Sequence, residues 1–336
     1  MKNNNKLKVG VIGLGHQSLE DHIPAIKASL DVNLVAVVEI DKNRLQSFLK
    51  DNPAVRGYKS LDNFLKKEKV DFIILAVPHY LHDEMTKKII KNKIHILKEK
   101  PFSTNLKEAK EIIKMANKYN VKVSTTLQRR FNPIYSTFFQ LADKIGKPFY
   151  IEIKYTFFTD KPGEGWRGKN KLAGGGCLLD MGYHMVDLLM WYFGLADKVM
   201  AETSCTGNDF QQYDAEDTAQ VLFKWESKSL WGSLLVSRVI PPKQEFLNLY
   251  GTRGCIHLER GKIERYSSNG ELCESLKREN SWPSAAQDQL DYFIKVIRGE
   301  KENINSPESH LCHLAFIEAA YKSKILNKYI NPKEFF

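Results

Sequence analysis

Three polar residues interrupt an apolar run at residues 174–189, which read GGGCLLDMGYHMVDLL. Asp180 and His184 are four positions apart, so on one helix they would share a face, with their side chains within hydrogen-bonding reach. Histidine has a reference pKa of about 6.5 and suits proton transfer near neutrality. Asp180 and His184 are therefore candidates for a reacting pair. The alternative is that they and Asp187 are buried structural residues, and for Asp187 this alternative is favoured.

Lys100 is a third candidate, in the sequence EKP at the end of a predicted strand. The carboxyl ends of parallel strands border the crevice where ligands bind in open α/β sheets, so this lysine is expected to face a ligand. A metal site made from Asp180, His184 and Asp187 is a poorer interpretation, because a single histidine on one helical turn is a weak ligand set. No metal is predicted.

The elements that would position these residues begin with a strand, a glycine turn and a helix. Residues 7–15 read LKVGVIGLG, and a helical pattern and a second strand follow. Gly13, Gly15 and Ser18 occupy the positions of a G-x-G-x-x-G motif, with serine in place of the third glycine. Gly13 permits the tight turn, and Gly15 lets the backbone approach a pyrophosphate at the helix N-terminus. This stretch predicts a dinucleotide site.

Glu39 ends the second strand, where an acidic residue accepts hydrogen bonds from the adenosine ribose. A carboxylate there repels a 2′-phosphate, so NAD is favoured over NADP, although Lys42 and Arg44 could soften this preference. The predicted cofactor contacts are Gly13, Gly15, His16, Gln17, Ser18, Glu39, Val77, Pro78, His82, Glu99, Lys100, Gln128, Trp166 and Arg167. For the loop that holds Trp166 and Arg167, the alternative is a mobile surface loop anchored by the tryptophan.

Strand and helix patterns alternate up to about residue 126, and the strand pattern VDFIILAVP is apolar throughout, as a strand covered on both faces should be. Such βα repeats imply a doubly wound parallel sheet. After residue 148 the segments FYIEIKYTF and DTAQVLFKW alternate apolar and polar residues, which indicates half-buried strands. We predict a dinucleotide-binding Rossmann domain over residues 1–126 and a substrate-binding and oligomerisation domain over residues 127–336.

The composition of the chain limits the class of protein, its location and its partners. The chain has 336 residues, of which 43% are hydrophobic and 27% charged, as in ordinary globular proteins. Its apolar runs are short for a membrane span, it has no cleavage site for export, and its five cysteines include no C-x-x-C pair, so a cytoplasmic location is expected. The net charge of +10 comes without a nucleic-acid-binding motif. No nucleic-acid or membrane partner is predicted.

Five motifs in order resemble the Gfo/Idh/MocA family of NAD(P)-dependent oxidoreductases. They are VIGLG, EKP, RRFNP, GWR and GGGCLLDMGYHMVDL, and the C-terminal QLDYFIKVIRGE and FIEAAYKSKI resemble the family's closing helices. The resemblance covers nearly the whole chain. It implies a Rossmann domain followed by an α/β domain with an open, largely antiparallel sheet. One face of that sheet commonly builds dimers or tetramers, so a homodimer or homotetramer is expected.

The resemblance also implies roles for the candidate residues. Lys100 would hold the reacting oxygen, Asp180 would orient the imidazole, and His184 would take the hydroxyl proton as the base. The substrate would be a polyol, sugar, inositol or nucleotide-linked sugar. Relatives often have a histidine near the cofactor at the position of His82, which could equally be a helix-start residue. Two rival functions are an NAD-using glycosidase of the same fold and a dinucleotide-binding sensor without catalysis.

Overall fold

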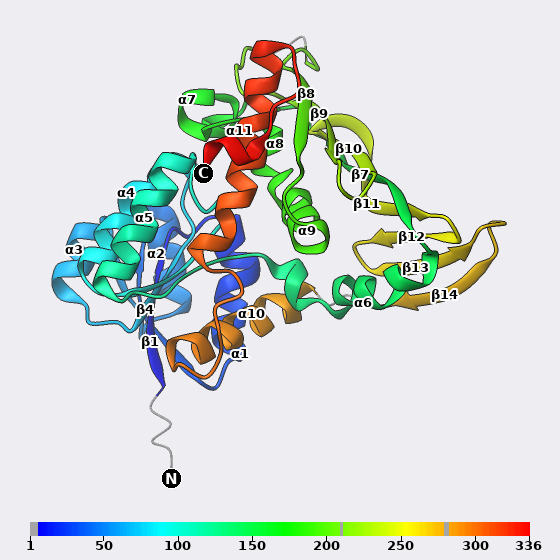
Figure 1. Cartoon of the computed structure of the whole chain (residues 1–336). Coiled ribbons are helices and arrows are strands. Elements are labelled where there is room, and N and C mark those ends of the chain that lie inside the picture. Colours follow the sequence, from blue (N-terminus) through cyan, green and yellow to red (C-terminus); the bar gives the residue numbers. More distant parts are fainter. Residues whose placement is uncertain (1–5, 209–210, 279–281) are drawn as a thin grey trace. The chain divides into compact units, whose positions relative to one another are not determined.

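The computed structural model describes residues 6–208, 211–278 and 282–336, and it divides into two compact units (Figure 1). The first unit comprises Met1–Phe131 and Trp282–His310, and the second comprises Asn132–Ser281 and Leu311–Phe336. A single boundary after residue 126 therefore does not describe this division. The reason is helix α10 (Trp282–Ile297), whose residues Leu290 and Phe293 complete the hydrophobic core of the first unit.

The first unit contains a six-stranded sheet in the order β3-β2-β1-β4-β5-β6, and every neighbouring pair is parallel. Its strands are β1 (Leu7–Ile12), β2 (Val32–Val38), β3 (Arg56–Tyr58), β4 (Phe72–Leu75), β5 (His95–Lys98) and β6 (Val123–Thr125). All four residues of β4 are fully buried, because helices cover both faces of the sheet. This arrangement confirms the predicted doubly wound Rossmann sheet.

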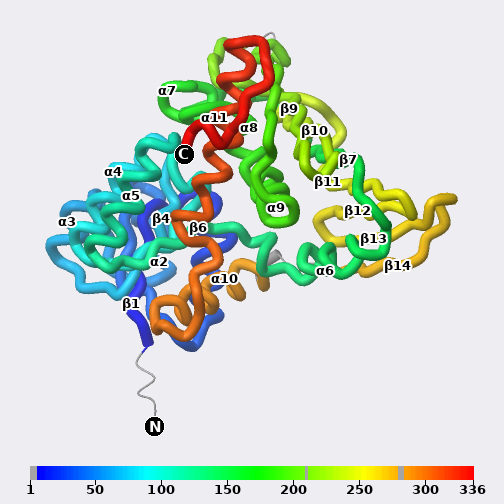
Figure 2. Tube along the Cα trace, in the orientation of Figure 1, coloured from blue at the N-terminus to red at the C-terminus, as the bar shows by residue number. Residues whose placement is uncertain are grey.

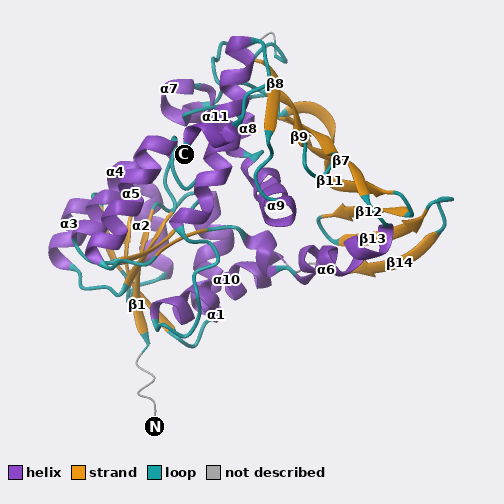
Figure 3. Ribbon diagram, viewed as in Figure 1, coloured by secondary structure: helices purple, strands orange, loops and turns teal. Residues whose placement is uncertain are grey.

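Helices pack on the two faces of this sheet (Figure 3). They are η1 (Ser18–His22), α1 (Ile23–Ala28), α2 (Lys42–Asp51), α3 (Leu61–Lys67), α4 (His79–Lys91), α5 (Leu106–Tyr119) and α10, with short 3-10 turns η2 (Gln128–Phe131) and η5 (Pro307–His310). Helices α1, α2 and α10 share one core with the sheet, and Figure 2 shows the distant segments α1 and α10 close together. Helix α3 covers the opposite face, where the Phe64 ring lies directly over Gly10.

The second unit contains an eight-stranded sheet in the order β14-β13-β12-β11-β7-β10-β9-β8. Its strands are β7 (Pro148–Phe158), β8 (Lys198–Ser204), β9 (Thr218–Trp225), β10 (Leu230–Ser237), β11 (Val239–Gly251), β12 (Gly254–Glu259), β13 (Lys262–Ser267) and β14 (Leu272–Lys277). Among the strand pairs of this sheet in the described part of the chain, β7 and β10 pair in parallel and the others are antiparallel. The predicted open, largely antiparallel sheet is confirmed, with Ile151 and Ile153 buried and Glu152 on the other face.

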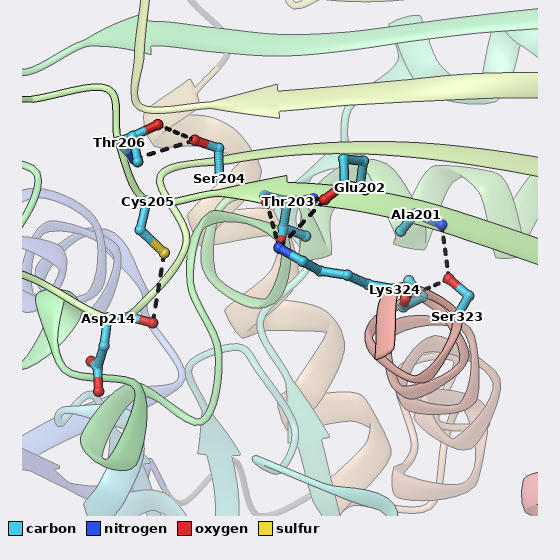
Figure 4. Close-up of polar contacts among 10 residues, drawn as sticks. Ala201, Glu202, Thr203, Ser204, Cys205, Thr206, Asp214, Ser323 and Lys324 are labelled. Atoms are coloured by element: carbon cyan, nitrogen blue, oxygen red, sulfur yellow. Dashed lines mark hydrogen bonds and ion pairs between the residues drawn. The ribbon is translucent and has the colours of Figure 1, made fainter. Parts of the chain in front are cut away.

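The helices of the second unit are α6 (Pro133–Ala142), η3 (Asp143–Ile145), η4 (Gly165–Gly168), α7 (Asn170–Ala173), α8 (Cys177–Asp180), α9 (Tyr183–Phe193), α11 (Leu311–Leu326) and η6 (Pro332–Phe335). Helix α11 covers the edge strand β8 (Figure 4). The Ser323 hydroxyl accepts from the Ala201 backbone N–H at 2.8 Å, and Lys324 Nζ donates to the Thr203 carbonyl at 2.5 Å. These bonds occupy backbone groups that an exposed edge would offer to another chain.

Candidate active site

The glycine loop after β1 has a backbone that only glycine can adopt. Gly13 has φ +91°, and a Cβ at this residue would lie 2.2 Å from the Ala76 carbonyl oxygen. At Gly15, in contrast, a Cβ would meet nothing within 4 Å. The Ser18 hydroxyl donates to the Gly13 carbonyl at 2.6 Å, which ties the following helix to the loop. The loop is therefore held at Gly13 by its close approach to Ala76 and by the bond from Ser18. The space beside Gly15 is open, as the approach of a pyrophosphate requires.

Glu39 braces the same loop. Its side chain is buried, and its Oε2 accepts from the Leu14 backbone N–H at 2.9 Å while its Oε1 accepts from the Asp41 N–H at 2.9 Å. The guanidinium of Arg44 lies 3.2 Å from Oε2, with its side chain half exposed. The carboxylate thus sits at the end of β2 where the sequence places it. Sequence patterns could not show that it also bonds to the glycine loop.

The loop after β5 brings Glu99 and Lys100 to the carboxyl edge of the sheet. Glu99 Oε1 lies 2.9 Å from His22 Nε2, and both residues are buried. Burial favours the neutral carboxyl, but the hydrogen bond and charge of His22 and the charge of Lys100 outweigh it and lower the pKa of Glu99. Glu99 is therefore a buried, charged group that fixes the start of this loop, next to the half-buried Lys100.

Two further predicted contacts, Gln17 and Gln128, lie on and beside the helix that follows the glycine loop. His16 and Gln17 begin this helix, and the Gln17 side chain donates to Asp21. Gln128 is buried, with Nε2 3.5 Å from the Asp21 carboxylate. The structure therefore brings the glycine-loop residues, Glu39, Glu99 and Gln128 to one edge of the sheet.

His82 lies in the interior, next to the residues that follow β4 and β5. Val77 and Pro78 follow β4 and are half buried, whereas the His82 side chain is fully buried. His82 Nε2 lies 2.8 Å from the Val77 carbonyl and Nδ1 lies 3.1 Å from the Pro101 carbonyl. Burial and the nearby charge of Lys98 lower the pKa of His82 well below its ordinary value. Both ring nitrogens face backbone carbonyls, and because the neutral imidazole has a single N–H, it donates a hydrogen bond to one of the two carbonyls at a time.

Asp180 and His184 do not share one helix, contrary to the prediction. Helix α8 ends at Asp180, and α9 begins at Tyr183. The break is at Gly182, whose N–H donates to the Cys177 carbonyl at 2.8 Å. A Cβ at Gly182 would lie 2.5 Å from the Leu178 carbonyl oxygen, so this tight turn requires glycine. Both candidate side chains are half buried in the second unit, whereas Lys100 belongs to the first unit.

The glycine run before α8 approaches another part of the backbone. A Cβ at Gly176 would lie 2.1 Å from the Glu216 carbonyl oxygen. The Glu216 carboxylate accepts from the N–H groups of Gly176 at 2.6 Å and Leu178 at 3.0 Å, and from the Tyr321 hydroxyl at 2.8 Å. Burial raises the pKa of Glu216. This carboxylate positions the start of α8, and no local sequence signal identified it.

Asp180 interacts with the loop that carries Trp166 and Arg167. Arg167 Nε donates to Asp180 Oδ2 at 3.0 Å, and the guanidinium lies 4.4 Å from the Trp166 ring centroid. The Arg238 guanidinium, which is buried, lies 3.5 Å from the carbonyl of Arg167. The Asp214 Oδ1 also accepts from the Asn170 N–H at 2.6 Å. Several polar contacts in addition to Trp166 therefore fix this loop.

Asp187 has a structural environment. Its Oδ1 lies 2.9 Å from His313 Nε2, and both side chains are 1% exposed. The His313 ring stacks on Tyr183, with ring centroids 5.4 Å apart. The pair joins α9 to α11 in the interior of the second unit. Asp187 therefore stabilises the helix that carries His184.

Within residues 6–208, 211–278 and 282–336, no three histidine, cysteine, aspartate or glutamate side chains are grouped as a metal site would need. None of the helices described there has the length and apolarity to cross a membrane.

Known proteins share this architecture. The chain is 25% identical over 254 residues to the myo-inositol 2-dehydrogenase of Thermotoga maritima, covering 75% of this chain and 74% of that protein. It matches the structure of an oxidoreductase from the same organism with a TM-score of 0.86 and 24% identity, over 99% of this chain and 100% of the other. It matches the WlbA dehydrogenase of Bordetella pertussis, solved with NADH and UDP-GlcNAcA, with a TM-score of 0.82 and 23% identity, over 97% and 99% of the chains.

Family models match both units. Residues 7–127 match the model of the oxidoreductase family with an NAD-binding Rossmann fold, and residues 141–257 match the GFO/IDH/MocA C-terminal domain. The glycine loop, the parallel sheet order and the mixed eight-stranded sheet agree with both matches. The chain belongs to the GFO/IDH/MocA family of oxidoreductases, and its first unit is the NAD-binding domain.

Proposed function

We propose that this protein is an NAD-dependent dehydrogenase or reductase that acts on a carbinol or ketone carbon of a sugar, an inositol or a nucleotide-linked sugar. The observation that carries the proposal is the glycine loop. Gly13 needs its positive φ, and the space at Gly15 is open, so the loop fits a pyrophosphate. When bound, the nicotinamide supplies hydride transfer at its C4.

In this proposal two side chains act on the reacting oxygen, and a third orients one of them. His184 takes the hydroxyl proton during oxidation and returns a proton during reduction. Asp180 orients the imidazole and stabilises its charged form, and Lys100 holds the oxygen and favours negative charge on it. Arg167 Nε donates to Asp180 Oδ2 at 3.0 Å and so fixes the position of that carboxylate.

The cofactor preference in this proposal is NAD over NADP. Glu39 is buried and fixed by two backbone N–H groups, so its carboxylate stays at the end of β2 and disfavours a 2′-phosphate. Arg44, 3.2 Å from that carboxylate and half exposed, is the group that could accept a phosphate. Calorimetric titration of the protein with NADH and NADPH tests the preference. Tighter binding of NADPH would contradict it.

The substrate class in this proposal follows the relatives. A myo-inositol dehydrogenase and a dehydrogenase solved with a nucleotide-linked sugar share the fold. The test is a panel of inositols, aldoses and nucleotide-linked sugars, followed at the nicotinamide absorbance band with wild type and Lys100→Met. We expect net turnover with at least one member and its loss in Lys100→Met by about two orders of magnitude or more.

The same panel separates the two rivals. Release of a glycoside's leaving group without net change in the cofactor would indicate the NAD-using glycosidase. Cofactor binding without turnover of any compound, together with tight binding of one of them, would indicate a sensor. Full activity of Lys100→Met would contradict the role of Lys100 in the site, but not the proposal that the protein is a dehydrogenase or reductase.

We further propose that the protein forms a homo-oligomer through the open face of the eight-stranded sheet. Trp231 and Tyr250 lie directly opposite Tyr150 on neighbouring strands, with ring centroids 4.6 Å and 5.8 Å from the Tyr150 ring. Trp231 is 52% exposed, so this aromatic cluster presents apolar surface on the open face of the sheet. Trp231→Glu should lower the mass measured by light scattering, whereas Ile325→Glu on α11 should not. A monomeric wild type would contradict the proposal.

A further inference from the structure

Lys98 is a fully buried lysine at the end of β5, directly before Glu99. Its Nζ donates to the Phe102 carbonyl at 2.6 Å and to the Thr86 hydroxyl at 3.1 Å. Burial lowers the pKa of Lys98 to about 8, an effect that the charge of Asp83 partly opposes. An apolar residue would fill this position without the cost of burying an ammonium group. Lys98 therefore calls for a role other than stability.

Helix α4 contacts the same segment at two more places. His82 Nδ1 lies 3.1 Å from the Pro101 carbonyl. The Asp83 Oδ2 accepts from the Thr104 hydroxyl at 2.9 Å and from its N–H at 3.3 Å. Together with the hydrogen bond from Lys98 Nζ to the Phe102 carbonyl, these polar contacts reach residues 101, 102 and 104. These are the positions that directly follow Lys100.

We propose that Lys98 is a positioning residue for Lys100. It holds the Phe102 carbonyl and thereby presents the Lys100 side chain in one orientation at the carboxyl end of β5. Lys98 is fully buried, so it acts through the backbone of residues 101–102 and touches neither substrate nor cofactor. Preorganisation of a reacting group by buried hydrogen bonds is how a second layer of residues supports catalysis.

The direct test measures the segment itself. Hydrogen exchange of a peptide covering residues 99–106 is compared in wild type, Lys98→Met and Lys87→Met. Lys87 lies on α4, the helix that carries Thr86, and pairs with Glu108 and Glu111, so its substitution is the matched control. We expect at least about tenfold faster exchange of this peptide in Lys98→Met, unchanged exchange of β4, and no change in Lys87→Met.

A second variant covers the case in which Lys98→Met does not fold. Thr86→Val keeps the size of the side chain and removes one partner of Lys98, so it should show a smaller increase in exchange of the same peptide. Exchange that stays within twofold of wild type in both folded variants would overturn the proposal. So would an equal increase in exchange over the whole first unit.

The consequence for turnover rests on the proposed function. If Lys100 holds the reacting oxygen as proposed, Lys98→Met should lower kcat by about tenfold to a hundredfold. The KM for NADH and the NADH dissociation constant should be unchanged. A kcat of Lys98→Met equal to that of wild type, together with faster hydrogen exchange of the peptide, would overturn the positioning role of Lys98. Absence of any turnover in wild type would instead count against the proposed function, while the exchange experiment would still test the hold on residues 101–102.

Discussion

Replacement of Lys98 by methionine should stabilise the protein at neutral pH. The pKa of this lysine falls from 10.5 to about 8 in the fold. At about 1.4 kcal/mol for each pKa unit, holding the ammonium in the interior costs about 3 kcal/mol. Methionine fills a similar volume but leaves the Phe102 carbonyl and the Thr86 hydroxyl without Lys98, a loss of about 1–2 kcal/mol. The net gain at pH 7 is about 1–2 kcal/mol.

This gain should depend on pH. The folded-state pKa of Lys98 lies below the unfolded value, so between about pH 8 and 10.5 the unfolded chain binds more protons than the folded one. Over that range the stability of wild type therefore rises relative to Lys98→Met. The two proteins should be equally stable near pH 9, and wild type should be more stable above pH 10, by about 1–2 kcal/mol.

Urea unfolding of both proteins at pH 7 and pH 10 checks this reasoning. Similar m-values in the two proteins would show that their unfolding transitions can be compared. A difference in unfolding free energy that is the same at both pH values would refute it. Lower stability of Lys98→Met at pH 7 would also refute it, because the hydrogen bonds would then outweigh the cost of burying the charge.

Three other predictions concern the cofactor loop and the interior. Gly13→Ala should lower the melting temperature and abolish NADH binding, whereas Gly15→Ala should leave the melting temperature unchanged and weaken NADH binding by about tenfold or more, because only Gly15 has open space beside it. Equal melting temperatures of the two variants would contradict this. Asp187→Asn should cost about 2–4 kcal/mol in urea unfolding, since it weakens a buried pair with His313, while NADH binding persists. Glu39→Gln should narrow the gap between NADH and NADPH affinity by about tenfold; a wider gap in calorimetry would exclude electrostatic repulsion as its cause.

Features that depend on neighbouring residues could be predicted from the sequence. The glycine turn, the burial of β4 and the half-buried pattern of β7 each follow from a few adjacent side chains, and the structure has them. The break between Asp180 and His184 could not be found by helical spacing, because it depends on the approach of Gly182 to the Leu178 carbonyl.

Features that depend on distant contacts were not predictable. The pairing of Glu216 with the N–H groups of Gly176 and Leu178 joins residues about forty positions apart. The structure likewise places Gly176 of the glycine run before α8 against the backbone of Glu216, an approach that no local pattern of residues indicates. Helix α10 likewise returns to the first unit only because of its packing in that core.

The assignment of the loop after β1 as the dinucleotide site can be tested by measuring cofactor binding. Calorimetric titration of NADH into wild type and Gly15→Ala, at equal concentrations and confirmed equal melting temperatures, measures whether the loop after β1 is the dinucleotide site. We predict saturable binding of one NADH per chain in wild type and binding weaker by about tenfold or more in Gly15→Ala. Absence of NADH and NADPH binding in folded wild type, or equal NADH affinity in the two proteins, would contradict the account.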